Sequence, residues 1–218
     1  MRSEQDLSPA AGFVAEEVAA ELPGLRLDWI SAPGCRRSSP RVLRAHLDSL
    51  ASRYRGASVV GMRTQPVPQA YRACFRQIGL DPDVDRVPSE EAALRRLIHG
   101  HFRSRDLIED ALLVALVETG VPVWALDGER VEPGGLGIRT SLEGEKLGLL
   151  EPVSVSAGRL VVADSQSIHG LLFGPVASGH EVTAATERIV LFSVGVEGVP
   201  AIHVEEALWV CIEALQSR

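Results

Sequence analysis

Residues 121–128, VPVWALDG, mark the point at which the chain changes from helix-forming to strand-forming sequence. The run from Val121 to Leu126 is rich in β-branched and aromatic residues, and the turn pair Asp127–Gly128 ends it, which is typical of a strand. Further short runs of the same kind follow, each bounded by turn residues, at 136–141, 159–163, 168–173 and 188–196. We therefore expect β-structure over most of the chain after Pro122.

The sequence before residue 121 has mainly the periodicity of helices. Leu43, Leu47, Leu50 and Tyr54 are spaced by four, three and four residues, which places them on one buried helix face. Similar patterns and their capping residues predict helices at about 10–21, 40–56, 67–78, 89–100 and 104–119, with a last helix at 204–215. Short strands are expected at 25–29 and 59–62.

Helices precede most of the strands and do not alternate with them, so the sequence predicts an α+β fold. We expect a mixed, sandwich-like sheet core with N-terminal and flanking helices. We also expect two parts, a helical segment of residues 1–60 packed on the core and a core domain of residues 61–218 that includes the C-terminal helix.

Composition is that of a soluble globule, with 218 residues, 45% apolar and 23% charged. No apolar run is long enough to span a bilayer, and residues 1–9 lack the apolar stretch of a secretory signal. Cys35, Cys74 and Cys211 are too far apart to form a zinc or disulfide pattern. We therefore expect a reduced, cytoplasmic protein without a membrane partner.

Charge is divided unevenly along the chain. Residues 36–105 hold 14 Arg against 6 acidic residues, although the whole chain has a net charge of −7. The net charge argues against bulk nucleic-acid binding and against a DNA partner, while the local excess leaves room for an anion site. An Arg-rich genome would also explain it, because Lys146 is the only lysine. Candidate RNA-binding residues are Arg37, Arg41, Arg44 and Arg55, although a solvated helix face would have the same pattern.

Familiar cofactor and metal motifs are missing from the sequence. It contains no phosphate loop and no G-x-S-x-G elbow, and the glycines at 134–137 lack the strand–turn–helix context of a dinucleotide site. His99 and His101 have no further ligand residues near them in sequence, so we expect no metal and no cofactor. The other histidines, His46, His169, His180 and His203, are isolated and are expected to be surface or core residues.

Seven short fragments between Tyr71 and Val199 have a characteristic order and spacing. They are VPSEEAALRR (87–96), the helix with Asp110, VPVWALD (121–127), IR with EGE (138–145), LVVAD (160–164), HGLLFG (169–174) and TERIVLF (186–192). In this order they resemble the B3/B4 region of the beta subunit of bacterial phenylalanyl-tRNA synthetase, and more closely the free-standing proteins built on that region. In the synthetase this region belongs to the editing domain, which hydrolyses the ester bond of tyrosine wrongly attached to tRNA for phenylalanine.

The resemblance implies a ligand pocket whose chemistry has changed. Where the family pattern has an asparagine, a histidine and a glutamate, this chain has Leu113, Trp124 and Phe192, while Gly174 matches a glycine of the glycine-rich turn. An aromatic ring cannot accept a phenol proton, so tyrosine recognition is not expected. The pocket implied by the resemblance comprises Trp124, Arg139, Glu145, Phe173, Gly174, Thr186 and Phe192, and no catalytic residue is assigned.

Three functions are consistent with these residues. The first is a tRNA-associated protein, acting in trans on aminoacyl-tRNA as an ester hydrolase if it is an enzyme. The second is a non-catalytic binder of an apolar or aromatic amino-acid-like metabolite. The third is a protein-interaction module in which Trp124 and Phe192 fill a vestigial pocket.

Overall fold

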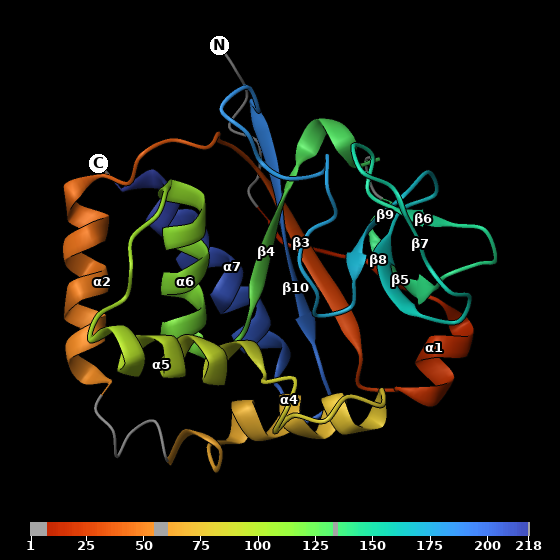
Figure 1. Cartoon of the computed structure of the whole chain (residues 1–218), viewed down its shortest axis with the longest axis horizontal. Helices are drawn as coiled ribbons and strands as arrows, with labels where there is room; N and C mark the ends of the chain where they lie inside the picture. Colours follow the sequence, from red (N-terminus) through yellow and green to blue (C-terminus); the bar gives the residue numbers. More distant parts are fainter. Residues whose placement is uncertain (1–7, 55–60, 133–134, 218) are drawn as a thin grey trace.

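The computed structural model describes residues 8–54, 61–132 and 135–217. Over these residues the chain forms two β-sheets and a set of α-helices (Figure 1). The sheet that contains the long strands β3 and β10 stands in the middle of the molecule, with most helices on one side and the second sheet on the other. The expected α+β fold class is confirmed.

The central sheet has four antiparallel strands. Their order is β1 (Ala10–Ala11), β3 (Arg26–Pro33), β10 (Arg188–Gly195) and β4 (Val123–Asp127). Strand β10 pairs with β3 over its whole length and with β4 from Ile189 to Ser193. Every residue of β10 after Arg188 is buried, which explains its largely apolar sequence, and the one polar side chain, Ser193, donates a hydrogen bond to the carbonyl oxygen of Pro122 at 2.8 Å.

The second sheet is mixed and built from shorter strands. Their order is β2 (Phe13–Val14), β5 (Gly137–Thr140), β8 (Leu160–Ala163), β9 (Ile168–Leu171), β6 (Lys146–Leu147) and β7 (Val153–Ser154). β2 pairs parallel to β5, and β6 pairs parallel to β9. The N-terminal strands therefore contribute to both sheets, β1 and β3 to the first and β2 to the second.

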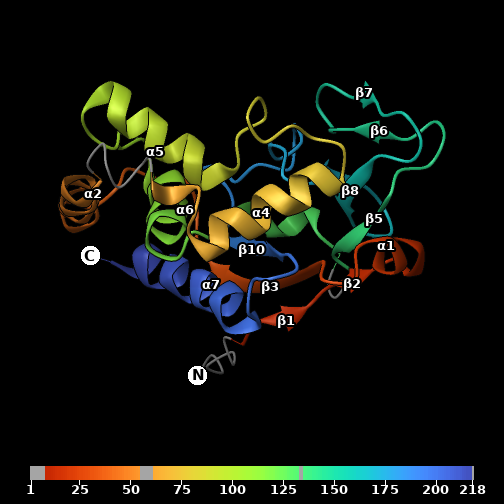
Figure 2. The same cartoon turned by 90° about the horizontal axis from the view of Figure 1, so that it is seen from below.

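Most of the helices lie on one side of the central sheet (Figure 1). They are α1 (Glu16–Glu21), α2 (Arg41–Arg53), α4 (Pro66–Gln77), α5 (Pro88–His99), α6 (Leu107–Thr119) and α7 (Ala201–Gln216), with a 3-10 turn η1 (Gly128–Arg130) after β4. α7 lies along β3 and β10, and α6 packs on α7 (Figure 2). α2 and α5 in turn contact α6.

Five of the six expected helices and all five strands expected after residue 120 are present, with ends shifted by a few residues. The helix expected at 10–21 is wrong in its first half, because residues 10–11 pair with β3 and residues 13–14 with β5. These long-range partners outweigh local helix preference. Residues 59 and 60 of the strand expected at 59–62 lie outside the described residues, and the expectation is wrong for residues 61 and 62, which are helical. The proposed division at residue 60 stays a prediction.

Gly137 is the point at which the N-terminal strand β2 meets the second sheet. A Cβ atom at Gly137 would collide with the backbone oxygen and ring of Phe13. We expect Gly137→Ala to lower the free energy of unfolding by about 1–3 kcal/mol, because backbone contacts cannot yield as a flexible side chain can. Urea denaturation measures the loss. Gly61→Ala is the control, since among the described residues no atom beyond its chain neighbours and its own helix lies within 4 Å of the added Cβ, and equal stability of the two variants would contradict this account.

Candidate functional site

Trp124 on β4 and Phe192 on β10 face each other directly. The antiparallel register pairs these two residues, and their rings stack with centroids 5.4 Å apart and planes 11° from parallel. Phe192 is buried, whereas Trp124 is half-buried. Trp124 and Phe192 therefore form one aromatic stack, with Phe192 below and Trp124 nearer the surface.

The turn after β9 covers this stack. Trp124 donates a hydrogen bond from Nε1 to the carbonyl oxygen of Gly174 at 3.0 Å. Phe173 has a φ of 61°, in the left-handed region that side chains other than glycine rarely adopt. Its ring is held between Phe75 and Trp124, at centroid distances of 5.0 and 6.3 Å. Aromatic packing thus holds the strained backbone in place.

The open space lies on the outer side of Trp124. Between Trp124, Phe192 and the turn there is a gap of only about 10 Å³, which is too small for a ligand. Beside it a cleft of about 780 Å³ runs between α5, α6 and the 173–175 turn, a volume in the range of small-molecule sites. Its apolar lining includes Leu112, Leu113, Leu116, Pro122, Val123, Trp124, Phe173 and Pro175.

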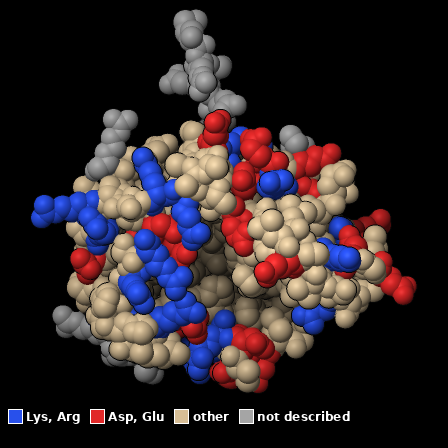
Figure 3. Space-filling view, turned by 45° about the horizontal axis from the view of Figure 1, so that its top comes forward, with Lys and Arg blue, Asp and Glu red and all other residues tan. Residues whose placement is uncertain are grey.

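The opposite wall of the cleft is rich in basic residues. It comprises Arg95, Arg96, His99, His101, Arg103 and Arg105, with Glu91, Glu109 and Asp110 among them. Arg95 pairs with Glu91 and Arg105 with Glu109, each at 2.8 Å, and all four side chains are at least one-third exposed. Figure 3 shows basic side chains gathered on one side of a hollow. The wall can therefore contact an anion while the floor contacts an apolar group.

Asp110 holds the framework of this wall. It is 1% exposed and accepts hydrogen bonds from the hydroxyls of Ser39 and Ser104, at 2.5 and 2.6 Å, and from the backbone of Arg105 at 2.9 Å. Through these bonds α6 fixes the segment before α2 and the loop between α5 and α6. Asp110 is therefore a structural anchor in this geometry.

The structure brings only part of the expected pocket together. Trp124, Phe173, Gly174 and Phe192 form the aromatic wall described above. Arg139 and Glu145 pair with each other in a bidentate bridge, at 2.8 and 2.7 Å, at the end of β5. The hydrogen bond from Arg139 lowers the pKa of Glu145. Neither residue lines the cleft.

The remaining expected residues also lie away from the cleft. Thr186 donates to Asp127 Oδ2 at 2.9 Å, which ties the segment before β10 to the end of β4. Arg37 precedes α2, Arg41 and Arg44 lie on its exposed face, and Arg55 falls outside the described residues. Sequence reasoning missed the cleft arginines, because the Arg excess of residues 36–105 does not show which of them share a surface.

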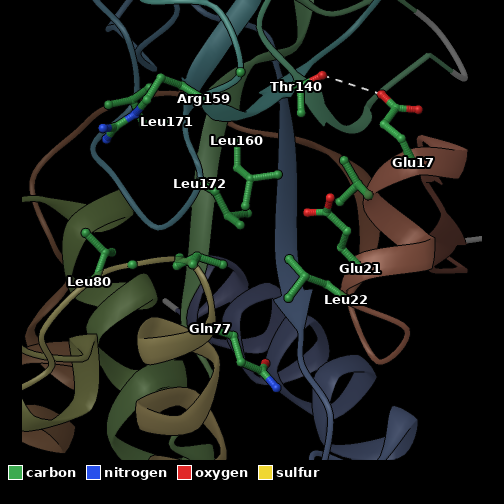
Figure 4. A pocket seen from close by; sticks show the side chains of 14 residues that line it. Glu17, Glu21, Leu22, Gln77, Leu80, Thr140, Arg159, Leu160, Leu171 and Leu172 are labelled. Atoms are coloured by element: carbon green, nitrogen blue, oxygen red, sulfur yellow. Dashed lines mark hydrogen bonds between the residues drawn. The ribbon is translucent and has the colours of Figure 1, made fainter.

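A second cavity of about 570 Å³ lies between α1, the end of α4 and the second sheet. Figure 4 shows Glu21 pointing into it near Leu22, Leu160 and Leu172, with Glu17 bonded to Thr140. The glutamates are exposed at the rim. None of the positions matched to the family pocket lines this cavity, so we place the candidate site at the α5–α6 cleft.

The side chains that line the cleft determine which reactive groups it can offer to a ligand. Among its lining residues there is no Ser, Thr or Cys to act as a nucleophile. Within the described residues, no three His, Cys, Asp or Glu side chains are grouped so as to hold a metal ion. A search of the same residues for a helix of the length and apolarity needed to cross a membrane found none.

Comparison with known proteins assigns this fold to a family. The family model described as B3/4 domain matches residues 52–205, and the chain belongs to that family. The chain is 31% identical over 198 residues to the phenylalanine–tRNA ligase beta subunit of Pseudomonas syringae pv. tomato. The aligned residues are 87% of the chain and 24% of that subunit. The Dickeya dadantii beta subunit is 39% identical over 94 residues, which are 41% of the chain and 11% of that subunit. The chain thus spans at most about a quarter of the length of these relatives.

The strained backbone at Phe173 gives an unusual order of variant stabilities. Phe173→Ala and Phe173→Gly both remove the packed ring, but only glycine adopts the left-handed backbone without strain. We expect the glycine variant to be more stable than the alanine variant by about 1 kcal/mol. Urea denaturation of both variants measures this difference.

Phe75, within α4, provides the matched control. In a helix interior glycine is less stable than alanine by about 1 kcal/mol, so Phe75→Gly should be the weaker of that pair. If the alanine variant were the more stable one at both positions, Phe173 would carry no backbone strain.

Proposed function

We propose that the α5–α6 cleft binds the aminoacylated end of a tRNA. The arginine wall contacts the phosphates of the terminal nucleotides, and the apolar floor around Trp124 contacts the aminoacyl side chain. In this proposal the protein acts in trans, as a separate relative of the B3/4 domain of phenylalanine–tRNA ligase beta subunits.

The convergence of three positions on one cleft carries this proposal. Leu113, Trp124 and Gly174 occupy positions of the family pocket pattern, come from three separate segments, and line a single cleft. The same cleft has four arginines on its other wall. A phosphate-binding wall beside an apolar floor suits a ligand that is anionic along one part and apolar at its end.

The proposed substrate side chain is apolar. A pocket that selects a hydroxyl needs a buried polar partner, which would be left unpaired by a ligand that lacks the hydroxyl. The floor offers Leu112, Leu113 and Leu116 at that place. If the bound ester is hydrolysed, water is the nucleophile, since the lining offers no hydroxyl or thiol.

The arginine wall makes the proposal testable by salt dependence. We expect the double variant Arg95→Ala, Arg103→Ala to bind tRNA at least about tenfold more weakly at low salt. The slope of log affinity against log salt should become shallower by about 0.7–0.9 for each lost phosphate contact. Filter binding at several salt concentrations measures both quantities.

Two further variants locate the binding surface. Arg130→Ala removes an exposed arginine outside the cleft and should bind tRNA as the wild type does. The triple variant Arg37→Ala, Arg41→Ala, Arg44→Ala tests the alternative surface next to α2. Loss of binding in the triple variant alone, or absence of tRNA binding by the wild type at low salt, would refute the cleft as the RNA site.

The apolar floor also supports a second candidate, a free amino-acid-like metabolite in the same cleft. A ligand at about 100 times its dissociation constant adds roughly 2.7 kcal/mol to stability. A thermal-shift panel of free amino acids, with Trp124→Ala as the variant that loses the floor, would detect such a ligand. Shifts with free amino acids and no tRNA retention would favour the metabolite; tRNA retention without such shifts would favour RNA.

A further inference from the structure

Three side chains form a buried hydrogen-bonded chain behind the cleft wall. Asp164 Oδ2 lies 2.8 Å from His169 Nε2, and His169 Nδ1 lies 2.9 Å from His180 Nδ1. All three residues are at most 2% exposed, and the two rings are nearly perpendicular. The two histidines are isolated in sequence, so only the fold reveals this arrangement.

The ionised carboxylate of Asp164 determines which nitrogen of each histidine donates its hydrogen bond. Burial opposes ionisation of Asp164, but backbone N–H groups of Glu132, Gln166 and Ser167, together with His169, lower its pKa below the ordinary value. Asp164 therefore only accepts, so His169 donates from Nε2 and its Nδ1 has the lone pair. His180 must then donate from Nδ1, which leaves its Nε2 without a proton. That atom is buried and has no partner among the described residues.

The hydrogen bonds of Asp164, His169 and His180 close the base of the loop between the two histidines, and the tip of this loop lines the cleft. Ala177 N donates to the carbonyl oxygen of His169 at 2.8 Å, and His180 N donates to that of Ala177 at 3.0 Å. The segment between the two histidines contains Phe173, Gly174 and Pro175, which line the cleft. The ring of His169 also borders the small gap beneath Trp124. The ring pair thus joins the two ends of the cleft wall.

A proton added to either ring breaks this arrangement. A proton on His169 Nδ1 would face the Nδ1–H of His180. If the His180 proton then moved to Nε2, or if His180 itself were protonated, a buried N–H group at His180 Nε2 would have no acceptor among the described residues. Burial is the main cause that lowers both pKa values, that of His180 to about 4. The charges of Asp164 and Glu181 favour a proton on His180, whereas His169 and Arg130 oppose it.

We propose that Asp164, His169 and His180 form an acid-sensitive latch that holds the 173–175 wall of the cleft in place and releases it on acidification. The effect on the wall stands on the geometry of the chain alone. The consequence for RNA rests on the function proposed above: when the wall opens, the cleft releases the aminoacylated end of the tRNA.

The pH range of the latch follows from linkage. In the open loop the histidines titrate near their ordinary pKa of about 6.5, and in the closed loop they titrate lower. The closed state is therefore fully favoured above about pH 6.5 and loses stability as the pH falls toward the closed-state pKa. For His180 alone, the ratio of open to closed loop rises about twentyfold between pH 7 and pH 5.

Amide hydrogen exchange tests the latch without RNA. The amides of Leu172, Gly174 and Ala177 each donate within or beside the loop. We expect them to be less protected than the amides of β10 at pH 7 and to exchange with little dependence on denaturant, as a local opening does. Their protection, corrected for intrinsic rates, should fall about twentyfold from pH 7 to pH 5. Exchange of these amides only together with β10 would overturn the proposal.

Substitution of His180 separates the latch from general acid effects. In His180→Asn an amide N–H replaces Nδ1–H without a titrating ring, so loop protection should fall less between pH 7 and pH 5 than in the wild type, and the remaining dependence comes from His169. His203→Asn, at a partly exposed histidine on α7, should behave as the wild type does. A pH dependence of His180→Asn equal to that of the wild type would contradict the latch.

Two further measurements make the test complete. Nitrogen-15 NMR of the wild-type histidines needs no variant and should show a proton on Nε2 of His169 and on Nδ1 of His180. The opposite forms would refute the directional chain. Added tRNA should raise loop protection at pH 7; if it does not while the pH effect persists, the proposed function fails and the latch stands.

Discussion

Strand β10 uses both of its edges, pairing with β3 along its whole length and with β4 along five residues. This double pairing fixes the register of three segments that are far apart in sequence, and a slip of one residue would turn every buried side chain to the other face. It places Phe192 opposite Trp124 and so sets the position of the aromatic stack. The turn after β9 then packs on that stack, and the cleft forms between the turn and α6.

Most of the local structure could be predicted from the sequence, because apolar periodicity and turn residues are local signals. The helices from Arg41 onward and the longer strands after residue 121 follow such signals, whereas the two-residue strands β6 and β7 are not among the predicted strands. The strands at 10–11 and 13–14 could not be predicted, because distant partners decide their conformation. For the same reason the cleft arginines and the His169–His180 contact needed the fold to bring them together. The ligand pocket that the resemblance implies, which includes Trp124, Gly174 and Phe192, stays a prediction.

The apolar residues Leu113 and Trp124 limit what the proposed site can select. A buried glutamate or asparagine at such a position would have to be hydrogen-bonded by its ligand or by the protein. Leu113 and Trp124 have no such requirement on their apolar surface, and the indole N–H of Trp124 is already bonded to Gly174. Selectivity at this floor therefore depends on shape and apolar area, which discriminate less sharply than a hydroxyl-binding group does.

Phe173 links the aromatic stack to the histidine chain. A glycine at this position would adopt the positive φ without strain. Here a side chain occupies the same left-handed backbone, so the turn persists only while its ring is packed and its base is closed. Packing against Tyr71, Phe75 and Trp124 provides the first condition. The ring pair of His169 and His180 provides the second, so a strained turn of this kind is the part of the cleft wall that opens most readily when either condition is removed.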